Sequence, residues 1–113
     1  MTESQIQAAI IRTFGTLPTM RIWRANTGAA RFGNQIVRFG VPGQADLTGI
    51  LPDGHRLEIE VKSATGRQSQ DQANYQRMIE RFGGVYILAR SVSDVAEALK
   101  QYGINSTETE GIE

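Results

Sequence analysis

Apolar residues recur every three to four positions in three stretches of the chain, which is the spacing of an amphipathic helix. Two of these stretches begin with a capping box, in which a Thr or Ser is followed three positions later by Gln. Glycine follows each of these two stretches and ends the helix. We expect helices at about 3–14 after the cap Thr2, from the cap Ser69 to about Phe82, and after the cap Ser93.

Strands are predicted between these helices. The segment 57–62 alternates strictly between apolar and polar residues, as in a strand with one apolar face, whereas 85–89 is continuously apolar, as in a strand buried on both faces. Further strands are expected at 21–25, 35–39 and 46–51. We therefore predict one compact α/β domain over 1–103, with a mixed central sheet and the element order αβββαβα.

Two segments between the expected strands have the composition of turns. The polar, glycine-rich segment 26–34 is expected to be a loop. The sequence Pro-Asp-Gly at 52–54 is a hairpin signal, which would place 46–51 beside 57–62.

Composition limits the chemistry. The chain has 113 residues, one histidine and no cysteine, so thiol nucleophiles, disulfides and multi-histidine metal sites are excluded. Any metal must therefore be held by oxygen atoms. The N-terminus lacks the pattern of a secretory signal, and no apolar run is long enough to span a bilayer, so we expect a cytoplasmic protein with no membrane contact.

The net charge of zero hides an asymmetry along the chain. Residues 1–45 hold five arginines and a single acid, Glu3, whereas 104–113 hold three acids and no base, and we expect this acidic tail to fray. Ten of the twelve basic residues are Arg, whose planar fork of donors suits phosphate. An ordinary mixed surface is one interpretation, and a surface that binds a polyanion is the other.

Asp46, Glu60 and Lys62 form the strongest candidate site. Residues two apart on a strand share a face, so Glu60 and Lys62 lie side by side, and the predicted hairpin brings Asp46 next to Glu60. Two carboxylates about 5 Å apart repel by about 3 kcal/mol at an effective dielectric of 20, and a hard cation such as Mg²⁺ removes that repulsion. The alternative is ordinary surface charge, because Glu-x-Glu-x-Lys also occurs on exposed strand faces.

Four ordered motifs resemble those of the VRR-NUC domain, the virus-type replication-repair nuclease branch of the PD-(D/E)xK superfamily. The resemblance covers about residues 3 to 100. One departure is Ala45, because members often have proline directly before the acidic residue. The motifs are Arg24-Ala25-Asn26-Thr27-Gly28-Ala29-Ala30, Val37-Arg38-Phe39-Gly40-Val41-Pro42-Gly43-Gln44-Ala45-Asp46, Glu60-Val61-Lys62-Ser63, and Gly66-Arg67-Gln68-Ser69-Gln70-Asp71-Gln72 with Gly83-Gly84.

The resemblance implies a restriction-endonuclease-like core and phosphodiester hydrolysis that depends on Mg²⁺ or Mn²⁺, without a small-molecule cofactor. It assigns Asp46, Glu60 and Lys62 to the active site, and it makes Asp46, Glu60 and the backbone carbonyl of Val61 the metal ligands. Glu3 matches an additional acid of the family, although an acid in a first helical turn is also favoured by the helix dipole. Gln72 matches a glutamine on the helix after the catalytic strand, although the capping box with Ser69 also accounts for it.

Basic and aromatic residues around the segment 26–34 are candidates for nucleic-acid contacts. The candidates for phosphate and DNA contacts are Arg24, Asn26, Arg31 and Arg38. Trp23 and Phe39 lie at strand positions and are expected in the core, with stacking on bases as the alternative. Phe32 would stack on bases, wedge into a junction or fill a dimer contact.

The functional prediction is a metal-dependent DNA endonuclease that acts on four-way (Holliday) junctions as a homodimer, in a bacterial cell or a phage-infected host. A single chain offers one site, so paired symmetric cuts need two chains. Two alternatives stay open: a nuclease that nicks flaps or plain duplex, and a catalytically silent DNA-binding module.

Overall fold

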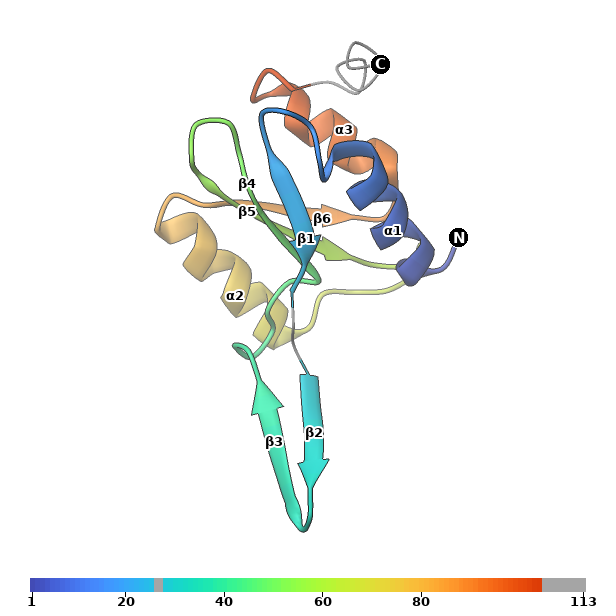
Figure 1. Cartoon of the computed structure of the whole chain (residues 1–113), viewed down its shortest axis with the longest axis vertical. Coiled ribbons are helices and arrows are strands. Elements are labelled where there is room, and N and C mark those ends of the chain that lie inside the picture. Colours follow the sequence, from blue (N-terminus) through green and yellow to red (C-terminus); the bar gives the residue numbers. More distant parts are fainter. Residues whose placement is uncertain (26–27, 105–113) are drawn as a thin grey trace.

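The structure, a computed structural model, describes residues 1–25 and 28–104 (Figure 1). These residues form a compact α/β fold with a mixed sheet and three helices. The elements in chain order are α1 (Glu3–Phe14), β1 (Arg21–Arg24), β2 (Gly28–Phe32), β3 (Gln35–Phe39), β4 (Leu47–Ile50), β5 (Arg56–Val61), α2 (Gln70–Arg81), β6 (Val85–Ala89) and α3 (Val92–Lys100).

The main sheet has the strand order β1-β4-β5-β6. β1, β4 and β5 pair antiparallel, and β6 joins β5 in parallel after the crossover through α2. α1 and α3 cover one face of this sheet and α2 covers part of the other (Figure 1). Both predicted capping boxes are confirmed, because Thr2 and Ser69 each accept from the backbone of the Gln three residues later.

Both faces of β5 are buried. Its apolar side, Leu57, Ile59 and Val61, packs into the main core with α1 and α3, as the alternation predicts. The opposite side carries Glu58 and Glu60, and it is covered by α2, so both carboxylates are buried as well. The glutamates are therefore not ordinary charges on an exposed strand face.

The prediction of a loop over 26–34 is wrong for most of that segment. Residues 28–32 form β2, which pairs antiparallel with β3 in a separate two-stranded sheet, and only 33–34 form the turn. Gly33 adopts φ +62 there, which suits a two-residue hairpin. This hairpin projects away from the body of the fold (Figure 1). The strand predicted at 35–39 is confirmed as β3, whereas β2 was not predicted, so the expected order αβββαβα has fewer strands before α2 than the structure has.

Three smaller expectations also need correction. The last helix is capped by Ser91 rather than Ser93, because the Ser91 side chain accepts from the Asp94 amide. Trp23 is 48% exposed, because α2 does not reach over β1 on that face of the sheet. Packing does not stop at 103, because Ile104 is buried in the main core; the rest of the predicted acidic tail, 105–113, lies outside the described residues.

No helix in the described part of the chain is both long and apolar enough to cross a membrane.

Candidate active site

The β4–β5 hairpin brings Asp46 and Glu60 together. Leu47 pairs with Ile59, so Asp46, one residue before β4, lies opposite Glu60. The predicted turn between the strands is present, with the Gly54 amide bound to the Leu51 carbonyl at 2.9 Å. Asp46 is held in place by the chain next to Glu60, because its Oδ2 accepts from the Val61 amide at 2.8 Å. The structure thus confirms the predicted juxtaposition.

Glu60 is buried without full hydrogen bonding. Its side chain is almost inaccessible, Oε2 accepts from Gln72 Nε2 at 3.3 Å, and Oε1 has no partner among the described residues. Burial, together with the contact and charge of Asp46, raises the pKa of Glu60 to about 8; the charge of Glu3 adds to this and that of Lys62 opposes it. A bound cation would offset the cost of ionising such a carboxylate and could bind its unpartnered oxygen, so Glu60 is a candidate cation ligand.

Lys62 lies directly beside this carboxylate. Its Nζ is 4.0 Å from Glu60 Oε2, and only 16% of its side chain is exposed. The Lys62 amide continues the β5–β6 pairing by donating to the Ala89 carbonyl at 2.9 Å. Pairing with β6 therefore fixes the backbone from which the ammonium group reaches the site.

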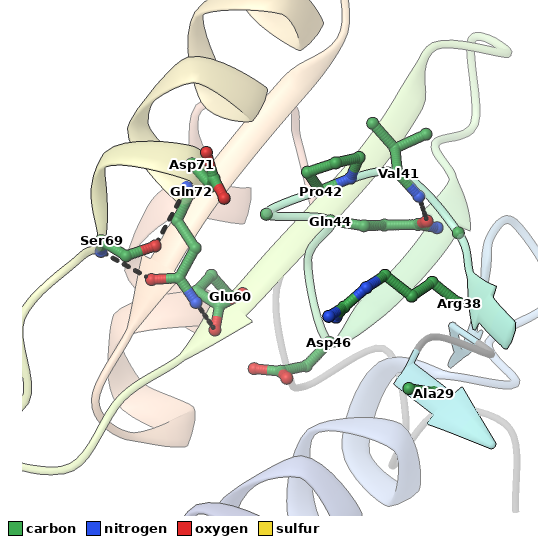
Figure 2. A pocket seen from close by; sticks show the side chains of 12 residues that line it. Ala29, Arg38, Val41, Pro42, Gln44, Asp46, Glu60, Ser69, Asp71 and Gln72 are labelled. Carbon is green, nitrogen blue, oxygen red and sulfur yellow. Dashed lines mark hydrogen bonds between the residues drawn. The ribbon is translucent and has the colours of Figure 1, made fainter. Parts of the chain in front are cut away.

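Gln72 closes the capping box of α2 and also contacts the candidate site. Its Oε1 accepts from the Ser69 amide at 2.9 Å, which closes the capping box of α2. Its Nε2 donates to Glu60 (Figure 2). One side chain thus begins the helix and orients the carboxylate.

Glu3 is joined to the strand end that carries Lys62. Its Oε2 accepts from the Ser63 amide at 3.0 Å, and its charge is close enough to raise the pKa of Glu60. The following loop is held from the other side by Arg90, which donates to the carbonyls of Ser63 and Gly66. The helix dipole alone does not account for this contact between Glu3 and the end of β5. Arg90 supports the same segment, and the sequence did not predict that role.

A cleft of about 590 Å³ lies between the Gly40–Gln44 loop and the start of α2 (Figure 2). Asp46 and Arg38 line one side of the cleft, and Glu60 with Gln72 lines the other. The loop contacts α2 very closely at Gly43, which has φ +77; a Cβ there would lie 2.2 Å from the Asp71 carbonyl oxygen. This close approach sets the distance between the two sides of the cleft.

Gly43→Ala is expected to lower the free energy of unfolding by about 2–3 kcal/mol, because the added methyl meets backbone and the left-handed conformation disfavours alanine. Urea unfolding measures this loss. Gly33→Ala is the matched control, because Gly33 also has positive φ but has nothing within 4 Å of the added carbon. Equal losses in the two variants would show that strain, and not the contact with α2, decides the effect.

The predicted DNA-contacting residues do not gather in one place. Arg38 lies in the cleft, and Arg31 lies further out on the hairpin. Arg24, at the end of β1, donates to Gln7 on α1 and does not line the cleft. Asn26 lies outside the described residues.

The carboxylates of Asp46 and Glu60 could bind a hard divalent cation only if backbone oxygens or water molecules supplied the remaining ligands. Among the described residues, no three acidic or histidine side chains are grouped closely enough to hold a metal ion by themselves. Asp46 and Glu60 supply two carboxylates, and Val61 lies between Glu60 and Lys62 with its side chain in the core. Mg²⁺ binds in such sites through one or two carboxylates and keeps several waters.

Glu58 and Tyr75 form a second buried polar group that the sequence did not predict. Glu58 Oε1 accepts from the Tyr75 hydroxyl and lies 3.6 Å from Arg56 Nη2. Alternation correctly predicted that Glu58 shares a face with Glu60, but its burial depends on α2. The helical spacing of Tyr75 and Ile79 was the available signal that α2 covers this face.

No protein-family model matches the chain, and a search of curated proteins finds no significant match.

Proposed function

We propose that the protein is a metal-dependent DNA endonuclease with a restriction-endonuclease-like core, as its motifs' resemblance to the VRR-NUC domain implies. The observation that carries the proposal is the pair Asp46–Glu60, in which a buried carboxylate with an unpartnered oxygen lies against a second carboxylate. This arrangement opposes stability, because the charge of Asp46 raises the cost of ionising the buried Glu60. A divalent cation such as Mg²⁺ or Mn²⁺ relieves that cost.

Asp46, Glu60 and the carbonyl of Val61 would hold the cation. When bound, it supplies a Lewis acid for the scissile phosphate and lowers the pKa of a water nucleophile. The chain's own contribution is orientation. The Val61 amide fixes Asp46, Gln72 fixes Glu60, and Glu3 with Arg90 fixes the backbone after Lys62.

Lys62 acts as a cation in this proposal. Its Nζ lies 4.0 Å from Glu60 Oε2, beside the proposed cation ligands. A protonated Lys62 would orient the nucleophile and stabilise the negative charge that develops on the phosphate.

Lys62→Ala is expected to slow the nicking of supercoiled plasmid in Mg²⁺ by at least about 100-fold, the range of a lost charge-stabilising donor. The fold should persist, since the ion pair that Nζ makes within the described part of the chain is long, at 4.0 Å. Circular dichroism checks the fold, and Lys100→Ala, a remote exposed lysine on α3, is the control. Equal nicking by all three proteins would show that Lys62 has no catalytic role.

We also propose a four-way DNA junction as substrate and a homodimer as the active form. Symmetric cuts on two strands require two sites, and one chain carries one set of Asp46, Glu60 and Lys62. Light scattering at assay concentrations should give twice the chain mass of 12.4 kDa for the free protein, and two chains per junction in the complex. One chain in both samples would remove the dimer and leave the nicking of flaps or duplex as the activity.

A further inference from the structure

The β2–β3 hairpin is an unsupported element. It forms a two-stranded sheet of its own and projects from the body of the fold (Figure 1). A two-stranded hairpin alone is marginally stable in water. Its exposed large side chains include Phe32 and Ile36, at 59% and 60%. Such an arm is expected to gain its order from something that it binds.

The strand register gives the arm two different faces. Ala29 pairs with Arg38 and Arg31 pairs with Ile36, and residues that are paired or two apart share a face, so both arginines lie on the same side. The other side carries Ala30, Phe32, Gln35 and Val37. The positive charge of the arm is therefore confined to one face.

This basic face continues directly from the cleft. Ala29 and Arg38 line the cleft together with Asp46 and Glu60 (Figure 2), and Arg31 lies two residues further out, about 7 Å along the strand. Neither Arg31 nor Arg38 makes an ion pair with a described residue. The sequence has no acid between Glu3 and Asp46. The basic face is thus complementary in charge to an extended polyanion that runs from the cleft along the hairpin.

We propose that the hairpin is a DNA-holding arm, in which Arg38 binds a phosphate at the cleft and Arg31 binds the same backbone further from the cut. This proposal rests on the proposed nuclease function, because that function identifies the ligand as DNA. The hairpin would then be the surface that holds the duplex next to the cleaved phosphate. Arginines that bind phosphate add affinity without reading sequence, so the arm would hold DNA of any sequence.

The first test uses the absence of cysteine from the chain, which lets one introduced cysteine carry a photoreactive group. Ile36→Cys places that group on the basic face, and Gln35→Cys places it on the opposite face of the same exposed tip. In metal-free buffer with a short DNA duplex, the Ile36 position should give several-fold more protein–DNA adduct. Equal yields, or adducts that join two protein chains, would overturn the proposal.

The second test measures DNA affinity against salt in EDTA, so that cleavage does not interfere. Arg31→Gln is expected to reduce the slope of log affinity against log salt by about one unit. Arg12→Gln, an exposed arginine in the last turn of α1, is the charge-matched control and should leave the slope unchanged. Identical salt slopes for Arg31→Gln and Arg12→Gln would overturn the proposal of a DNA-holding arm.

The two proposals fail in different ways. Cleavage by the wild type with no effect of Arg31→Gln on binding would contradict the proposal of a DNA-holding arm and support the nuclease proposal. Salt-dependent binding that Arg31→Gln weakens, without cleavage in Mg²⁺ or Mn²⁺, would keep the arm and remove the nuclease. Absence of DNA binding by the wild type would contradict both.

Discussion

Asp46→Asn is expected to abolish Mn²⁺ binding and reduce DNA cleavage by at least about 1,000-fold, while the chain stays folded. Asparagine retains a carbonyl oxygen that can accept from the Val61 amide, so the backbone contact that fixes residue 46 survives. The change removes one of the two negative charges at the site, and hard cations depend on those charges. Calorimetry with Mn²⁺ and a cleavage gel measure the two losses.

The control for Asp46→Asn is Asp53→Asn. Asp53 lies in the exposed turn at the far end of the β4–β5 hairpin, where it binds His55. The control changes the net charge by the same amount and leaves the cleft untouched. Full Mn²⁺ binding by Asp46→Asn would show that the carboxylate pair is not a metal site.

Glu60→Gln is expected to stabilise the metal-free protein in alkaline solution and to abolish cleavage. Burial and Asp46 raise the pKa of Glu60 from its ordinary value of 4.5 to about 8 in the folded chain. The folded state therefore binds more protons than the unfolded state between these values, so stability falls as pH rises from about 5 to about 8 and then levels. Glutamine removes the ionisation and its cost.

Urea unfolding in EDTA at pH 5 and pH 9 tests this expectation. The wild type should lose about 2–4 kcal/mol more than Glu60→Gln between the two conditions, after allowance for relaxation around the charge. Adding Mg²⁺ at pH 9 should stabilise the wild type and leave the variant unchanged. If the free energy of unfolding depended on pH equally in both proteins, Glu60 would ionise without cost in the folded chain. The electrostatic argument that Glu60 is a cation ligand would then fail.

The sequence was most informative where local signals decided the structure. Strict alternation at 57–62 and the Pro-Asp-Gly turn were sufficient to place Asp46 opposite Glu60. The capping boxes of α1 and α2 follow from three-residue spacings. In each case the interacting groups lie close along the chain or are joined by one short turn.

Tertiary contacts decided what the sequence could not. The burial of Glu58 and Glu60 depends on α2 lying over their face of the sheet, which alternation does not report. The hairpin strand β2 was missed because its small residues, Gly28, Ala29 and Ala30, have weak strand propensity and pair only through β3. The ties from Glu3 and Arg90 to Ser63 join residues far apart in the chain and leave no local pattern.

The most direct test of the nuclease proposal is a cleavage gel with Mg²⁺ and with Mn²⁺ on a four-way junction, a flap and a linear duplex of matched sequence. Wild type, Asp46→Asn and Lys62→Ala would be compared on each substrate. We predict paired symmetric nicks on the junction by the wild type with either metal, and none by the variants. No cutting of any substrate by the wild type, together with retained DNA binding, would contradict the account and leave a DNA-binding module.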